Sequence, residues 1–398
     1  MFFAAPPRLA AARRAIHLVS TAPQCRAVVE RILHSPAKAV GVDCEGSLGR
    51  FGDLSLVQLA TDEQVVLIDV LAGGHAVVEP LAPLLRGREV LKVFHDCRED
   101  ASTLLHRHGV SMAGVFDTQV GFTTWLERRN LEPYQASIGE TLRTFQQRLY
   151  RSHRWDEFEK RHISPQRWQQ RPLDAQAIRY AVEGVAHLLP LQRALCRELG
   201  DPNGDLVLRR GAGYLDYARL NGSELPSQEI SLLRPGLPLR AMLAVRKPDS
   251  LYLKINRAPI SGAVLDARDL RDFEDLRPGD VASCRVKFLS DCRQFVHLQR
   301  EGNGRLVFDR ARQEMRELPS QEEMDEIRPP RQSSSYDLGG APGGAPAPGA
   351  GPGAELEDEP RSFQERKPEV FFKKGGRGSV KVRPSGFRPP KRRGSSDG

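Results

Sequence analysis

Residues Val40 to Gly46, with the sequence Val-Gly-Val-Asp-Cys-Glu-Gly, constrain the fold more than any other stretch of this chain. Apolar residues lead into an acid-x-acid pair, which predicts a short buried strand that carries Asp43 and Glu45 near its end. Side chains two apart on a strand point the same way, so both carboxylates are expected on one face. Such a pair can bind a divalent metal ion, although an isolated acid-x-acid pair is more often a solvated strand end.

The surrounding sequence predicts an α/β domain. Three β-rich runs at 39–44, 54–59 and 65–70 are separated by a few polar or glycine residues, which favours an antiparallel meander. Strands at 90–95 and 115–117 then alternate with helical segments, and most of 134–199 has a helical pattern. We therefore expect a mixed sheet with helices on both faces.

A second region, 232–300, contains five short β-type runs separated by Pro-Gly and Pro-Asp turns. This spacing predicts a small β-barrel, and the run from Leu276 to Leu298 resembles the closing half of an S1-type OB barrel. Such barrels bind single strands by stacking bases on exposed aromatic rings, for which Tyr252, Phe288 and Phe295 are the candidates. The alternative is that all three rings belong to the barrel core, because rings at alternating positions usually face inward.

The end of the chain carries the positive charge. Residues 361–398 contain twelve Lys or Arg and three acids, a net charge of +9, against +8 for the whole chain. The preceding residues 339–354 are all Gly, Ala or Pro, which predicts a disordered linker. The RG-containing tail is expected to contact nucleic-acid phosphates without sequence preference. Its candidate contacts are Arg377, Arg388, Lys391, Arg392 and Arg393. A solubilising or nuclear-localising role of the tail is the alternative.

The cellular setting is predicted from features that are missing from the sequence. The six cysteines show no C-x-x-C spacing and no secretory segment precedes them, which indicates reduced thiols in an intracellular protein. No apolar run reaches the length of a membrane span, so no membrane partner is expected. We expect a cytoplasmic location. Nuclear and organellar locations stay open; Arg8, Arg13 and Arg14, which precede the first acid, Glu30, would suit a short organellar presequence.

Several ordered motifs give the acid pair a context. Lys92-Val93-Phe94-His95 leads to Asp100, with Asp96 near a helix N-cap, and Asp117-Thr118-Gln119 follows the fifth strand. Trp168-Gln-Gln-Arg171-Pro172-Leu173 precedes Tyr180-Ala-Val-Glu183-Gly184-Val185. Between about Ile16 and Leu199 the chain resembles the DEDD 3'-5' exonucleases of the ribonuclease D type with a motif tyrosine. Within that family it is most similar to the branch of Egalitarian and the piRNA-biogenesis exonuclease-domain protein, whose members are known chiefly as RNA-binding adapters.

The resemblance implies a ribonuclease H-like sheet and a site of two Mg²⁺ or Mn²⁺ ions held by Asp43, Glu45 and Asp100. Tyr180 would orient the attacking water. Asp96 would be structural, and Asp117-Thr118-Gln119 would be structural or close to the substrate, without binding metal. One position departs from the family pattern. Gly184 stands where the family carries its last metal-binding Asp, and a glycine offers no ligand. Glu183 is the candidate replacement, but neighbouring residues on a helix diverge by about 100°, so its side chain would have to turn back.

Two hypotheses follow from Gly184. The first, which we favour slightly, is a metal-dependent 3'-5' exonuclease that acts on single-stranded RNA and is impaired by the missing ligand. The second is an inactive RNA-binding adapter on an exonuclease fold. DNA as a ligand and protein partners in RNA processing stay open. The expected organisation is as follows: a disordered lead-in (1–14), the exonuclease domain (15–200), a linker (201–231), the barrel (232–300), a helical or irregular extension (301–330) and a disordered tail (331–398).

Overall fold

The computed structural model describes residues 14–152, 166–309 and 314–317. Nearly all of the predicted lead-in and the whole of the predicted tail lie outside these residues. The five tail candidates, Arg377, Arg388, Lys391, Arg392 and Arg393, lie outside them too. No helix within the described ranges is long and apolar enough to cross a membrane.

The N-terminal domain is built on a six-stranded mixed sheet with the strand order β1-β4-β3-β2-β5-β6. Its strands are β1 (Ala15–Val19), β2 (Ala39–Ser47), β3 (Asp53–Ala60), β4 (Gln64–Asp69), β5 (Leu91–Phe94) and β6 (Val115–Asp117). β2, β3 and β4 pair antiparallel, which confirms the predicted meander. β1 pairs parallel with β4, and β5 pairs parallel with β2 and β6.

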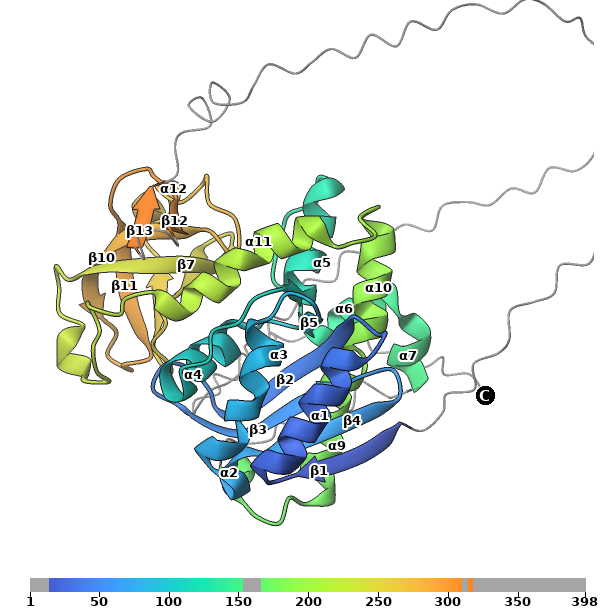
Figure 1. Ribbon diagram of the computed structural model, residues 1–398. Helices are drawn as coiled ribbons and strands as arrows, with labels where there is room; N and C mark the ends of the chain where they lie inside the picture. Colours follow the sequence, from blue (N-terminus) through green and yellow to red (C-terminus); the bar gives the residue numbers. More distant parts are fainter. Residues whose placement is uncertain (1–13, 153–165, 310–313, 318–398) are drawn as a thin grey trace, which may run out of the picture.

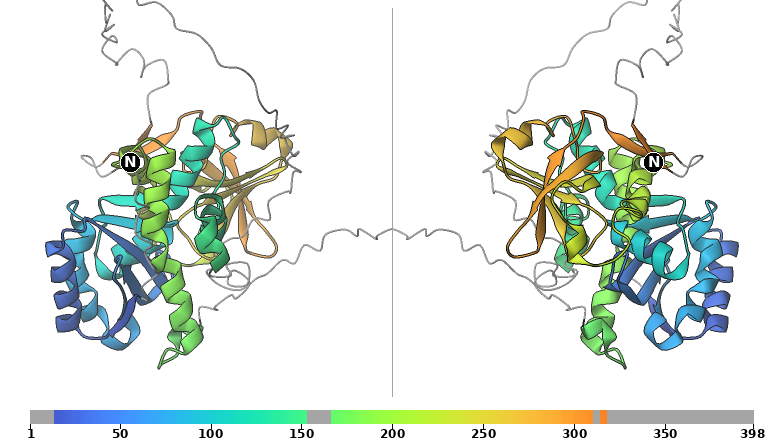
Figure 2. Two further views of the ribbon diagram at one scale, coloured as in Figure 1. Left: turned by 90° about the vertical axis from the view of Figure 1, so that its right-hand side faces the viewer. Right: turned by 90° about the vertical axis from the view of Figure 1, so that its left-hand side faces the viewer.

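Helices cover both faces of this sheet, as the sequence predicted (Figures 1 and 2). The α-helices are α1 (Ala22–His34), α2 (Val70–Gly73), α3 (Ala82–Arg86), α4 (Arg98–His108), α5 (Thr118–Arg128), α6 (Ile138–Phe145), α7 (Gln147–Ser152), α9 (Ala175–Ala186) and α10 (Leu188–Glu198). Short 3-10 helices are η1 (His75–Val77), η2 (Glu79–Leu81) and η3 (Arg167–Gln169). In Figure 2, α1 and the α9–α10 pair lie on opposite sides of the sheet.

Helix α9 packs closely on the central strand β2. It buries Ala177, Ala181 and Val185, which recur every four residues and so form one face of the helix. On the strand side, a Cβ atom added to Gly41 would lie 3.1 Å from the carbonyl oxygen of Val185. The contact therefore depends on small side chains on both elements, and it places α9 directly over the residues that follow Gly41.

The second domain is a closed five-stranded barrel, as predicted. Its strands are β7 (Pro238–Lys247), β8 (Ser250–Lys254), β9 (Ser261–Val264), β10 (Val281–Leu289) and β11 (Phe295–Arg300). The pairing runs β11-β9-β8-β7-β10 and is closed by β10 with β11. α12 (Ala267–Arg271) connects β9 to β10. Leu243, Leu253, Val286 and Leu298 are among the buried residues that fill the barrel.

Two segments differ from expectation. The predicted linker 201–231 contains α11 (Asp205–Asp216), η4 (Tyr217–Arg219) and η5 (Ile230–Leu232). α11 buries Val207 and Tyr214, but Gly211 and Gly213 lower its helix propensity, which obscured the pattern. The predicted extension 301–330 contains the hairpin of β12 (Leu306–Asp309) and β13 (Glu314–Glu317), which continues the barrel sheet from β10.

The barrel is fixed to the exonuclease-like domain through α4 (Figure 1). Three side-chain contacts join them: Arg98 Nη1 to Met242 Sδ at 3.9 Å, Lys254 Nζ to Glu99 Oε1 at 2.8 Å, and Ser102 Oγ to Asn256 Oδ1 at 2.6 Å. All three α4 residues lie within two positions of Asp100 in the sequence. The helix that carries this acid is therefore held from both domains.

Candidate functional site

Strand β2 delivers the predicted acid pair. Asp43 lies directly across from Gln58 on β3 and is 7% exposed, while Glu45 is half-buried. Cys44, between them, points to the opposite side of the strand and is fully buried. The strand thus presents two carboxylates on the side covered by α9, and Asp43 lies deeper than Glu45.

Position 184 lies immediately beside Asp43. A Cβ atom added to Gly184 would be 3.1 Å from Asp43 Oδ2. Among the described residues, and apart from its two chain neighbours and the local helix backbone, no other heavy atom would lie within 4 Å of it. A side chain at this position would therefore point at the Asp43 carboxylate. The structure brings together the first and last motifs of the sequence, and it places a glycine where the two meet.

Tyr180 lies one helical turn before Gly184 and is half-buried. Its ring packs against buried Trp168 with the ring centroids 6.0 Å apart and the planes at 61°, an edge-to-face contact. Asp174 caps the N-terminus of α9 by accepting hydrogen bonds from the backbone amides of Gln176 and Ala177. The cap and the ring contact together fix the helix that carries Tyr180.

Arg171 links this motif to the sheet. Its guanidinium makes a bidentate pair with buried Asp69, with both N–O distances 2.6 Å, and also donates to the carbonyl oxygens of Trp168 and Ser55. Bidentate arginine–carboxylate pairs are geometrically specific. The conformation of the Trp-x-x-Arg segment is thus tied to β3 and to the end of β4.

Asp100 lies in the first turn of α4 and is 1% exposed. The neighbouring acids have the structural roles predicted for them. Asp96, at a backbone φ of +62°, makes a bidentate pair with buried Arg98. Asp117 accepts hydrogen bonds from the amides of Asp96 and Cys97 and caps α5.

Glu183, the candidate replacement for the missing acid, contacts a buried histidine. Its Oε2 atom lies 2.8 Å from Nε2 of His187, one turn further along the helix. His187 is 5% exposed, so this contact is largely shielded from water. One oxygen of the Glu183 carboxylate is therefore engaged with His187, whereas a side chain at position 184 would point at Asp43.

Gln58 was missed by the sequence analysis. Its side chain is fully buried opposite Asp43, and neither its Oε1 nor its Nε2 has a hydrogen-bond partner among the described residues. Cross-strand neighbours in an antiparallel pair share a face, so this amide belongs to the same site. Only the strand register could have identified it, because Leu-Val-Gln-Leu reads as an ordinary buried strand.

The predicted metal ligands are three carboxylates, Asp43, Glu45 and Asp100. Within the described ranges, no group of three or more His, Cys, Asp or Glu side chains is arranged to hold a metal ion. A side chain at position 184 would meet Asp43 at close range. Asp43, Glu45 and Asp100 remain the carboxylates predicted to hold the Mg²⁺ or Mn²⁺ that the resemblance implies.

The three candidate rings of the barrel do not belong to its core. Phe288 is 49% exposed, and Tyr252 and Phe295 are half-buried. Phe288 lies on β10, Tyr252 on β8 and Phe295 on β11. The alternative that all three rings fill the barrel is therefore wrong, because the inward positions are taken by aliphatic residues.

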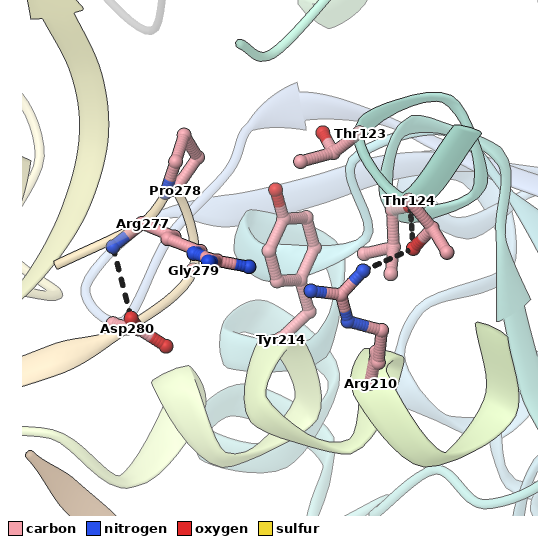
Figure 3. Close-up of a pocket in the computed structure, with 9 residues that line it drawn as sticks. Thr123, Thr124, Arg210, Tyr214, Arg277, Pro278, Gly279 and Asp280 are labelled. Carbon is pink, nitrogen blue, oxygen red and sulfur yellow. Dashed lines mark hydrogen bonds between the residues drawn. The ribbon is translucent and has the colours of Figure 1, made fainter. Parts of the chain in front are cut away.

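A separate pocket of about 160 Å³ lies between α5, α11 and the turn that enters β10 (Figure 3). Tyr214 stands at its centre, and Arg210 donates to Thr124 Oγ1 at 2.9 Å. Both Arg210 and Arg277 pair with Glu127. Burial raises the pKa of Asp280 at its edge. The two arginines that line this pocket are thus paired with an acid. The pocket lies where the N-terminal domain and the barrel meet.

Comparisons with known proteins agree with the motifs. The profile of the 3'-5' exonuclease family matches residues 16–200. Ribonuclease D of Gluconacetobacter diazotrophicus is 32% identical over 187 residues, which cover 46% of this chain and 42% of that protein. The piRNA biogenesis protein EXD1 of Xenopus laevis is 30% identical over 229 residues, which cover 53% of this chain and 51% of that protein.

Among solved structures, the complex of Trypanosoma brucei RNase D with GMP is similar, with 28% identity and a TM-score of 0.44. The match covers 52% of this chain and 65% of that one. The chain spans about half the length of the curated relatives it matches. The matches to ribonuclease D and EXD1 confirm the resemblance read from the sequence motifs.

Proposed function

We propose that the Asp43 site receives the 3' end of a single-stranded RNA, because residues 16–200 match the profile of the 3'-5' exonuclease family and resemble ribonuclease D. We propose further that hydrolysis at this site is impaired, so that the protein acts mainly by holding the RNA end. The single observation that carries the proposal is the placement of Gly184 against Asp43.

The absence of a carboxylate at position 184 affects hydrolysis because this position lies beside Asp43. Two-ion phosphodiester hydrolysis needs several acids that converge on both ions. Mg²⁺ also demands a nearly ideal octahedral set of oxygen ligands. With a glycine at 184, the site loses the acid nearest to Asp43. Glu183, the residue before Gly184, is already in contact with His187, which disfavours it as a replacement ligand.

The remaining acids suit a terminal ribose. Ionised carboxylates are hydrogen-bond acceptors only, and the 2'- and 3'-hydroxyls of a 3'-terminal nucleoside are donors. Glu45 is half-buried and so is more accessible than Asp43. Recognition of a 2'-hydroxyl is how a protein distinguishes RNA from DNA at one position. We therefore propose a preference for an RNA 3' end with free hydroxyls.

A nuclease assay tests the impairment. A 5'-labelled single-stranded RNA is incubated with Mg²⁺ or Mn²⁺ and with the wild-type chain, Gly184→Asp, or Gly184→Asp combined with Asp43→Ala. Gly184→Asp is expected to produce a ladder that shortens from the 3' end at least 10-fold faster than the wild type, and Asp43→Ala is expected to abolish it. Gly213→Asp on α11 is the matched control, since it adds the same charge to another half-buried helical glycine.

A binding assay tests end recognition. RNA with a free 3'-hydroxyl is expected to bind more tightly than the same RNA with a 3'-phosphate, because the added charge would face Glu45 and Asp43. Equal affinities for the two RNAs would refute recognition of the end.

A second candidate function is supported by the acids that remain. Asp43 and Glu45 lie on β2, Asp100 on α4 and Tyr180 on α9, and the resemblance assigns each of them a role in hydrolysis. On this alternative the wild-type chain is itself a metal-dependent 3'-5' exonuclease. A wild-type ladder that Asp43→Ala removes, with no gain from Gly184→Asp, would favour it over the holding function.

We also propose a supporting role for the basic tail. Its net charge of +9 suits sequence-independent contact with phosphates. Removing residues 361–398 should weaken RNA binding and reduce its dependence on salt. A salt dependence that is unchanged by this truncation would argue that the tail only improves solubility.

A further inference from the structure

The barrel carries a continuous row of side chains across four neighbouring strands. Tyr252 on β8 pairs with Ala263 on β9, Ala263 pairs with His297 on β11, and His297 pairs with Phe288 on β10. Residues that are directly opposite in adjacent strands share a face of the sheet. We call Tyr252, His297 and Phe288, together with Phe295, the ring row.

The ring row lies on the outside of the barrel. Leu253 and Leu298, one residue away from Tyr252 and His297, belong to the buried barrel core. Since side chains alternate along a strand, Tyr252 and His297 must point outward. Phe288 at the end of the row is 49% exposed, whereas each of these core neighbours is at most 1% exposed.

The rings are arranged in two pairs. The Phe288 and His297 rings are stacked, with centroids 4.1 Å apart and planes at 17°. The Tyr252 and Phe295 rings lie 5.7 Å apart, and the ammonium group of Lys247 lies 5.0 Å from the Tyr252 ring centroid. Burial lowers the pKa of His297, and nearby Lys287 lowers it further. The first pair is nearly coplanar, whereas the planes of Tyr252 and Phe295 are tilted by 58°, so the row offers several separate ring faces.

The position of the row suits a strand that also reaches the exonuclease domain. Lys254, two residues after Tyr252 on the same outward side, donates to Glu99 of α4 at 2.8 Å. The row thus starts beside the helix that carries Asp100.

We propose that the ring row is a second binding site for single-stranded RNA, where bases of an internal segment stack on the two ring pairs. The choice of RNA as the ligand rests on the proposed function. The site itself is inferred from the arrangement of the rings on the barrel. Stacking of a base on an aromatic side chain tolerates any sequence, because every base has a flat face. The strand order of the barrel, with a helix between its third and fourth strands, supports an assignment to the OB type, whose outer face binds oligonucleotides in this way.

The test separates this site from the Asp43 site by the shape of the RNA. A circular single-stranded oligoribonucleotide has no 3' end, so it cannot be held by its end at Asp43. Its affinity for the full chain is measured by fluorescence anisotropy at a salt concentration high enough to weaken contacts made by the tail. The wild-type chain is expected to bind the circular RNA.

The variants replace rings by side chains that cannot stack. Phe288→Leu and Tyr252→Leu keep an apolar side chain, and each is expected to weaken binding of circular RNA by about 5- to 100-fold. The matched control is Leu265→Ala, since Leu265 is a 50% exposed aliphatic residue of the same barrel. This control is expected to bind like the wild type. Thermal unfolding of each variant confirms that it is folded.

Two results would overturn the proposal: no binding of circular RNA by the wild type, or equal affinities of the wild type and both ring variants. Either would mean that the row serves another ligand, such as a protein. Failure of the proposed function has a different signature. In that case linear RNA would bind equally with a 3'-hydroxyl and a 3'-phosphate, while the ring variants would still lose affinity.

Discussion

Restoring an acid at position 184 should destabilise the folded chain when no divalent cation is present. In Gly184→Asp the new Cβ would lie 3.1 Å from Asp43 Oδ2, so the two carboxylate groups would be about 4 Å apart. At an effective dielectric constant of about 20, two unit charges at this distance repel each other by about 4 kcal/mol. Gly184 is partly exposed, and Asp has a higher helix propensity than Gly, so the expected net loss is about 2 kcal/mol.

The pH dependence of this loss has a definite sign. A like charge nearby raises the pKa of the introduced carboxyl group in the folded state above its unfolded value of about 3.9. The repulsion is therefore absent below about pH 4 and grows as the pH rises through the raised value. Gly184→Asp should match the wild type in free energy of unfolding at pH 4 and be less stable at pH 7.5.

Urea unfolding at both pH values, with and without Mg²⁺, measures the effect. Mg²⁺ should restore the stability of Gly184→Asp at pH 7.5, because a cation that binds only the folded state stabilises it. Gly213→Asp should show neither the pH dependence nor the rescue. If Gly184→Asp is as stable as the wild type at pH 7.5 without Mg²⁺, the two positions do not face each other, and the impairment argument fails.

Three further substitutions test the packing around the site. Gln58→Met should raise the free energy of unfolding, measured by urea denaturation, by about 1 kcal/mol, because it removes a buried amide that has no hydrogen-bond partner among the described residues. A lower free energy of unfolding would instead indicate that a bound water satisfies this amide. Arg98→Met should lower it by about 3 kcal/mol or more by leaving Asp96 without its bidentate partner, and a change below 1 kcal/mol would contradict this. Burial lowers the pKa of Lys92 to about 8, so between pH 8 and about 10 the unfolded chain binds more protons than the folded chain, and the wild type should gain stability relative to Lys92→Met as the pH rises. A difference in free energy of unfolding that stays constant over this range would mean that Lys92 is not desolvated.

The sheet and barrel could be predicted because their signals are local. The run from Val40 to Gly46 is apolar up to its acids, and the meander follows from three strands with short connections. The five runs between Pro-Gly and Pro-Asp turns became β7 to β11. In each case the hydrophobic period and the turn residues indicate the same structure, which makes a strand recognisable without tertiary information.

The candidate site could be predicted only in part. The position of Gly184 beside Asp43 followed from ordered motifs, although no local pattern links two residues that are 141 positions apart. Sequence reasoning allowed Glu183 to turn back toward the site, since it could not show that His187 holds the carboxylate. Gln58 gave no signal, because a single polar residue in an apolar strand is informative only once its cross-strand neighbour is known.

The coupling between the domains was the least predictable feature, and it changes how the site must be understood. Arg98, Glu99 and Ser102 look like ordinary residues at the start of a helix, yet each contacts the barrel. Glu99 also accepts a hydrogen bond from buried Tyr217, so the segment expected as a linker takes part. Asp100 lies between these anchors, and a shift of α4 would break contacts on both sides. The position of this acid is therefore determined jointly by the exonuclease domain and the barrel.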